Sequence, residues 1–249
     1  MTIPTLDATG KVVVVTGGSK GLGREMVLGF AEAGADVVVA SRKLEPCEEV
    51  AAEVRALGRR ALAVSCHVGD WEQCGALIEA TVAEFGRIDV LVNNAGIAPV
   101  PPSLLDVTPD LFDKTIAVNL KGPLRLTALA AEHMPPGGAV INVSSKASLH
   151  PSPFTVVYAA AKAGLNALTR ATAEEYGPRG IRVNAIVCGT FHTDSLHASL
   201  PTDDAQAQMA AGIALGRIAR ADEIVGTALY LASDASSYLT GELILLDGG

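Results

Sequence analysis

A tyrosine and a lysine stand four residues apart in the chain, as Tyr158 and Lys162. On a helix this spacing puts the phenol and the ammonium group on one face. A phenol with a pKa near 10 must lose about three pKa units, or roughly 4 kcal/mol, to exchange protons near neutral pH. One cation at ~4 Å in an effective dielectric of ~20 supplies about that much. The pair could therefore act as a general acid/base, although its spacing alone is weak evidence.

Polar residues follow two of the apolar segments that we expect to be strands. Ser145 comes after 139–143 and thirteen residues before Tyr158, and Asn94, Ala95 and Gly96 come after 88–92. Ligands of open α/β sheets bind at the C-terminal ends of the strands, so we expect these residues near one site. Asn119 lies inside a predicted helix, where an amide is a mediocre helix former, and by itself it is more simply a surface residue.

A glycine-rich turn follows the first predicted strand, in Thr16-Gly-Gly-Ser-Lys-Gly-Leu-Gly23. Its glycines let the backbone turn tightly and approach a pyrophosphate, and the next helix directs its free N–H groups at the phosphates. Because the turn joins a strand to a helix, it predicts a dinucleotide site rather than an ordinary loop. The residues expected to bind the cofactor here are Gly17, Ser19, Lys20, Gly21, Leu22 and Gly23.

The second predicted strand ends at Ser41, Arg42 and Lys43. NAD-binding proteins place an acidic residue near this point for the ribose 2′-hydroxyl, whereas NADP-binding proteins use basic residues for the 2′-phosphate. The nearby acid, Asp36, lies at the start of the strand. Arginine carries a fork of donors that matches a phosphate, so Arg42, with Lys20, favours NADP; the alternative is a solvated loop cation.

Short apolar segments alternate with longer helical stretches along the whole chain. Strands are expected at 12–15, 37–40, 61–64, 88–92, 139–143, 181–187 and 243–246, and helices at 21–34, 45–57, 70–85, 109–133, 156–176 and 222–231. Continuous apolar runs are typical of strands covered on both faces. The alternation predicts an α/β fold, a doubly wound parallel sheet of seven strands with helices on both faces. We expect a single domain over residues 1–249, with a substrate-loop region of uncertain structure at 188–220.

Composition narrows the classes of partner. The chain has 249 residues, 49% of them apolar, and a net charge of −8 from 19 basic and 27 acidic residues. Excess acid argues against nucleic acid and anionic membranes as partners. The four cysteines form no CxxC pair, so we expect free thiols. His192 and His197 fall on different helix faces, so we expect no metal site. No signal peptide and no apolar run of about 18 residues are present, so a cytoplasmic location is expected.

Together these motifs resemble the short-chain dehydrogenase/reductase family, in its short single-domain branch with a Rossmann-like fold. The likeness also includes Arg182-Val-Asn184 before Gly189 and the ending Leu246-Asp-Gly-Gly249. It implies that Tyr158 is the acid/base and that Ser145 hydrogen-bonds the substrate oxygen. Lys162 would lower the Tyr158 pKa and hold the nicotinamide ribose, and Asn119 would support a water in the proton relay.

The resemblance also implies a homotetramer formed through the two long helices. The small side chains of Ala159, Ala163, Ala167 and Ala171 are compatible with close helix contact. Two departures from the family stand out. Cys188-Gly189 replaces the usual Pro-Gly, although Phe191, whose N–H would meet the nicotinamide carboxamide, and Thr193 remain. His67, before Val68, replaces an aspartate that usually contacts the adenine.

The stretches 41–43 and 66–69 are similar to NADPH-dependent carbonyl reductases within the family. We therefore expect an NADP(H)-dependent oxidoreductase acting on a small-molecule ketone or secondary alcohol. An NAD-dependent alcohol or sugar dehydrogenase is the alternative, and a cofactor-binding regulator without catalysis is a further one. An epimerase and an enoyl reductase fit less well. Mostly apolar pocket residues favour a hydrophobic carbonyl: Ile97, Pro99, Val100, Lys146, His150, Phe154, Phe191, His192, Leu196 and Leu200.

Overall fold

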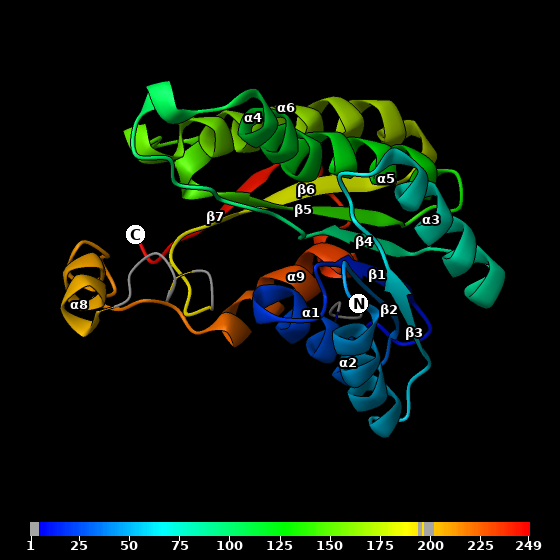
Figure 1. The fold of residues 1–249 in the computed structure, drawn as a ribbon. Coiled ribbons are helices and arrows are strands. Elements are labelled where there is room, and N and C mark those ends of the chain that lie inside the picture. Colours follow the sequence, from blue (N-terminus) through cyan, green and yellow to red (C-terminus); the bar gives the residue numbers. More distant parts are fainter. Residues whose placement is uncertain (1–4, 194–195, 197–201) are drawn as a thin grey trace.

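The computed structural model describes residues 5–193, 196 and 202–249, and its centre is one parallel sheet (Figure 1). The strand order is β3-β2-β1-β4-β5-β6-β7. The bounds are β1 Val12–Thr16, β2 Asp36–Ser41, β3 Ala61–Ser65, β4 Val90–Asn93, β5 Ala139–Ser145, β6 Arg182–Cys188 and β7 Leu243–Leu246. The chain order reverses direction between β1 and β4, which is the point where open α/β sheets bind ligands. The predicted doubly wound sheet is confirmed.

Helices cover both faces of the sheet (Figure 1). α1 (Gly21–Glu32), α2 (Leu44–Ala56) and α9 (Val225–Ala232) lie on one side, while α3 (Trp71–Phe85), α4 (Pro109–Ile116), α5 (Gly122–Ala131) and α6 (Val156–Tyr176) lie on the other. Successive strand residues point to opposite faces, so Val13 and Val15 belong to one core and Val14 to the other. Both faces are thereby buried, which explains the continuous apolar runs.

Local signals set several of the helix ends. Asp70 caps α3 by accepting hydrogen bonds from the N–H groups of Glu72 and Gln73. At the other end Gly86 adopts a left-handed conformation, with φ of 78°, that most side chains avoid. These caps fix where the helices begin and end, and so define the loops that join them to the strands. The loops at the C-terminal ends of the strands carry the site.

Two segments differ from the prediction. The expected helix 109–133 is interrupted by a π-helical turn at Ala117–Lys121, where Gly122 N–H donates to the carbonyl of Ala117 five residues back. Within 188–220 the structure adds α8 (Asp203–Ala211), which Thr202 caps by accepting from Ala205 N–H. None of the helices in the described part of the chain is long and apolar enough to cross a membrane.

Candidate active site

Strand β5 and helix α6 bring Ser145, Tyr158 and Lys162 to one edge of the sheet. Ser145 is the last residue of β5 and pairs with Cys188 at the end of β6. Helix α6 packs against both strands. The Nζ atom of Lys162 donates to the carbonyl of Val143 in β5 at 2.7 Å, which fixes the helix against the strand at the level of Ser145.

A polar network holds the loop that carries Ser145. The Oγ of Ser145 accepts from Ala147 N–H at 3.2 Å, and Ser148 Oγ donates to the Ser145 carbonyl at 2.6 Å. The Nδ2 of Asn166 donates to Ser148 Oγ at 2.8 Å. Asn166 was not among the predicted site residues. Its spacing of four from Lys162 and eight from Tyr158 on one helix was the available signal.

Burial sets the protonation of Tyr158. Desolvation raises the pKa of its phenol, and a hydrogen bond with the Ser145 side chain opposes that rise. Lys162 Nζ lies 5.8 Å from the centre of the Tyr158 ring and donates to a backbone carbonyl instead. The net direction is upward, so the lowering of the Tyr158 pKa by Lys162 is not seen in this structure. The phenol is therefore a proton donor at neutral pH.

Lys162 is a buried cation, with only 3% of its surface exposed. Desolvation lowers the pKa of its ammonium to about 8. The thiol of Cys188 is buried close by, and burial raises its pKa to about 12, so this thiol stays protonated. A neutral Cys188 side chain leaves Lys162 and Tyr158 as the groups able to exchange protons at this point.

Asn119 lies in the π-helical turn and is fully buried, which excludes the surface alternative. Its Nδ2 donates to the Ile97 carbonyl at 2.9 Å, and its Oδ1 accepts from Ile97 N–H at 3.2 Å. A Cβ on Gly96 would lie 2.9 Å from Asn119 Oδ1 and 3.7 Å from Lys162 Nζ. Gly96 thus allows the β4 loop, the π turn and Lys162 to meet. π-helical turns occur frequently at functional sites.

The glycine-rich turn has the geometry of a phosphate cradle. A Cβ on Gly23 would lie 2.1 Å from the Gly17 carbonyl, so α1 begins directly against the turn. Asn94 Nδ2 donates to the carbonyls of Thr16 and Gly17, at 2.8 and 3.2 Å, and ties the β4 loop to it. The first turn of α1 has no side-chain cap and no acidic residue. Its N–H groups and positive end fit an anion such as a pyrophosphate.

The predicted adenosine contacts lie at the ends of β2 and β3. Ser41 Oγ lies 3.1 Å from Cys47 Sγ, and Arg42 is exposed in the loop that precedes α2. His67 Nδ1 accepts from Gly69 N–H at 3.2 Å, which holds the half-buried ring beside the buried Val68. The structure therefore brings Ser41, Arg42, His67 and Val68 to the same edge of the sheet as the glycine-rich turn.

The segment after β6 also lies close to the glycine-rich turn. Thr193 lies so close to Gly21 that a Cβ there would be 3.6 Å from Thr193 Cγ2. Phe191 is buried and pairs with Ala219 in an isolated parallel bridge. The predicted pocket residue Leu200 lies outside the described residues. His197, which was considered only as a possible metal ligand, also lies outside them.

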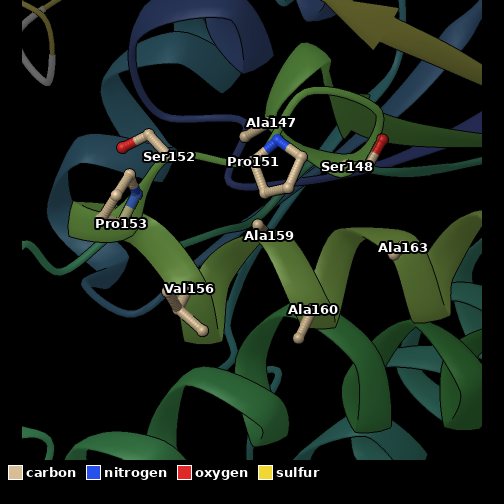
Figure 2. A pocket seen from close by; sticks show the side chains of 9 residues that line it. All are labelled: Ala147, Ser148, Pro151, Ser152, Pro153, Val156, Ala159, Ala160 and Ala163. Carbon is tan, nitrogen blue, oxygen red and sulfur yellow. The ribbon is translucent and has the colours of Figure 1, made fainter. Parts of the chain in front are cut away.

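A hollow of about 450 Å³ lies between the Ser145 loop and the outer surface of α6 (Figure 2). It is lined by Ala147, Ser148, Pro151, Ser152, Pro153, Val156, Ala159, Ala160 and Ala163. None of these is a predicted substrate-pocket residue, and neither Tyr158 nor Lys162 lines it. The hollow is thus a feature of the α6 surface rather than the place where the acid/base chemistry converges.

Comparisons with known proteins show similarity over nearly the whole chain. Residues 17–249 match the family model described as Enoyl-(Acyl carrier protein) reductase. The chain is 36% identical to L-rhamnose 1-dehydrogenase (NAD(P)(+)) of Sphingomonas sp., over 96% of each chain. Its fold is similar to a blue fluorescent protein from a metagenomic library in complex with NADPH (TM-score 0.92, 32% identity, 98% of each chain). It is also similar to a short chain dehydrogenase from Burkholderia cenocepacia in complex with NADP (TM-score 0.90, 32% identity, 97% and 98% coverage).

Proposed function

Because the chain belongs to the short-chain dehydrogenase/reductase family, we propose that it is an NADP(H)-dependent carbonyl reductase. It would transfer a hydride between nicotinamide and a ketone or secondary alcohol. The observation that carries the proposal is the convergence of a half-buried, protonated Tyr158 with Ser145 and the buried Lys162 at the end of β5. Such an acid beside a hydroxyl donor suits protonation of a carbonyl oxygen.

The cofactor, when bound, supplies the hydride that reaches the carbonyl carbon. In our proposal the Tyr158 phenol gives its proton to the carbonyl oxygen, which forms the alcohol and leaves a phenolate. The Ser145 hydroxyl hydrogen-bonds the same oxygen and orients it. The Lys162 ammonium holds the nicotinamide ribose, and Asn119 fixes the Gly96–Ile97 backbone beside it. A raised Tyr158 pKa keeps the phenol protonated near neutral pH, which is the form that can give a proton to a carbonyl oxygen.

The residues present fit NADP(H). The uncapped start of α1 offers its N–H groups to the pyrophosphate. Arg42 is exposed beside Ser41, so its guanidinium can reach a 2′-phosphate. Residues 41–43 include no carboxylate that would repel this phosphate. NADPH and NADP in two similar structures support this choice. His67 and Val68 would lie against the adenine, and Phe191 and Thr193 near the carboxamide.

The surface of α6 supports the proposal of a homotetramer. Ala160, Ala163, Ala167 and Ala171 are exposed along it, whereas Ala159 is buried. Small exposed side chains allow two helices to approach closely, and the hollow of Figure 2 continues the same surface. The four free, buried cysteines are in keeping with a reducing compartment such as the cytoplasm.

The test is a turnover screen of mixed hydrophobic ketones and aldehydes, with NADPH and NADH side by side. We expect oxidation of NADPH with at least one carbonyl, which is measured as the loss of the absorbance of the reduced nicotinamide. Tyr158→Phe is the matched negative control, and Tyr176→Phe removes a hydroxyl from the far end of the same helix. No turnover of any carbonyl by the wild-type enzyme would contradict the proposal.

A second candidate is an NAD-dependent alcohol or sugar dehydrogenase. It is favoured by the similarity to L-rhamnose 1-dehydrogenase, whose name gives NAD(P)+ as its cofactor. The same catalytic residues would run the reaction in the direction of oxidation, with Tyr158 as the base. Turnover of aldoses with NAD+ that exceeds turnover of hydrophobic carbonyls with NADPH would favour this candidate.

A further inference from the structure

An ion pair joins the loop after Ser145 to the C-terminal end of the chain. The Nζ of Lys146 lies 2.7 Å from Oδ2 of Asp247. The Asp247 side chain is only 6% exposed, while that of Lys146 is 41% exposed. Lys146 holds the pKa of the Asp247 carboxyl below its usual value, so the acid is charged at neutral pH. The proposed hydride transfer uses neither side chain.

The pair spans three neighbouring strand ends. Ser145, Cys188 and Leu246 lie in one registered row across β5, β6 and β7. The residues that directly follow the three strands are Lys146, Gly189 and Asp247. Gly189 N–H donates to the Leu246 carbonyl at 2.9 Å, and a Cβ on Gly189 would lie 2.6 Å from Asp247 Cα. Glycine therefore lets Asp247 approach, and the ion pair bridges β5 and β7 across it.

The same aspartate organises the C-terminal tail. Its Oδ1 accepts from Gly249 N–H at 3.1 Å. The Gly248 carbonyl accepts from Leu215 N–H at 3.0 Å, and a Cβ on Gly248 would lie 2.7 Å from Ile213 Cγ2. The tail thus contacts residues 213–215, which follow α8 in the substrate-loop region. A continuous path of contacts runs from Ser145 through Lys146 and Asp247 to that region.

We propose that the Lys146–Asp247 ion pair, which we name the strap, sets the position of Ser145 relative to the Cys188–Gly189 turn and to residues 213–215. Lys146 and Asp247 are then positioning residues, and this role rests on the carbonyl reductase function proposed above. The strap matters in this chain because Cys188 lacks the fixed φ of a proline at the turn. Removal of the lysine alone would leave a buried carboxylate without its partner, which is more disruptive than loss of an exposed pair.

The first test is steady-state kinetics of Asp247→Asn and Lys146→Met. A small displacement of Ser145 should lower kcat for carbonyl reduction by about tenfold, because catalysis depends steeply on the position of reacting groups. The KM for NADPH should stay within about twofold, since the strap does not touch the glycine-rich turn. Lys146→Arg keeps the charge and should retain kcat. Arg55→Gln, which removes an exposed pair with Glu48 at 3.3 Å on α2, is the matched control with unchanged kinetics.

The second test does not depend on activity. Amide hydrogen exchange in 146–150 and in 213–215 should increase together in Asp247→Asn and in Lys146→Met, and stay unchanged in Arg55→Gln. Unchanged exchange in both segments would overturn the strap, as would raised exchange with an unchanged kcat. A KM for NADPH that rises while kcat holds would also overturn it. If the wild-type enzyme reduces no carbonyl, the proposed function fails, and the exchange result alone decides whether the strap couples the two segments.

Discussion

The catalytic end and the adenosine end of the site are built in different ways. At the catalytic end Asn119 and Lys162 are buried, and each hydrogen-bonds to backbone of a neighbouring element. At the adenosine end the Arg42 side chain is exposed. The backbone of Arg42 is held in place, because its carbonyl accepts a hydrogen bond from Ser65 Oγ at 3.1 Å. The first end has its geometry imposed by packing, while the second presents charge from a loop.

This difference separates what each end can control. Burial moves the pKa of Tyr158 upward and that of Lys162 downward, so the protein tunes proton transfer through desolvation. An exposed guanidinium is screened by water and salt, and it selects a phosphate by charge and hydrogen bonding alone. Substitutions at the catalytic end should therefore change rate by larger factors than substitutions at the adenosine end change cofactor choice.

The largest effect should come from Tyr158→Phe. Loss of the phenol removes the proton donor, and general acid catalysis contributes about 10²- to 10⁴-fold, so we expect kcat to fall by about a thousandfold. Binding of NADPH, measured by fluorescence titration, should change little because the glycine-rich turn is untouched. Tyr176→Phe should behave as wild type. Residual activity above about 10% of wild type would contradict the acid/base role.

The contrast between the two ends also explains how far the sequence could predict the molecule. The strands, most helices and Ser145, Tyr158 and Lys162 at one edge follow from apolar runs and spacing. Asn119 as a buried clamp depends on the π-helical turn, which no local pattern indicated. The Lys146–Asp247 pair joins residues about 100 positions apart through strand register, so no local pattern indicates it. Helix α8 is only weakly amphipathic, so its sequence gives little periodic signal.

Lys162→Ala should have the next largest effect. The ammonium is expected to hold the ribose and is buried between β5 and the Gly96 loop, so its removal should hurt both binding and turnover. We expect kcat/KM for NADPH to fall by about a hundredfold, with a higher Kd for NADPH. Lys114→Ala, at an exposed position of α4, is the control. A variant with normal cofactor affinity would assign Lys162 to packing alone.

Cofactor choice should respond more weakly, at the adenosine end. One charge-assisted hydrogen bond of about 1.5–3 kcal/mol corresponds to roughly 10- to 150-fold, so wild type should prefer NADPH over NADH by about that factor. Arg42→Gln should remove most of the preference, and Lys43→Gln should keep it. Ser41→Asp with Arg42→Ile should reverse it, because a carboxylate accepts from the ribose hydroxyl and repels a phosphate. Equal use of both cofactors by wild type would make Arg42 a solvated surface cation.

The smallest effect should be the pH dependence that burial gives to the catalytic end. The pKa of Lys162 is lowered to about 8, so the ammonium is charged below pH 8 and becomes neutral above it. The Tyr158 pKa is raised, so the phenol stays protonated over the same pH range. Titration of the phenol therefore adds no further change to the pH profile of the rate. With carbonyl saturating, kcat/KM for NADPH reports the free enzyme, and it should fall by about twofold between pH 7 and pH 8 and more steeply above. Lys162→Arg, which stays charged, should remove this limb while Arg42→Gln keeps it. A flat profile in wild type from pH 7 to 9 would mean that the charge of Lys162 does not govern cofactor capture.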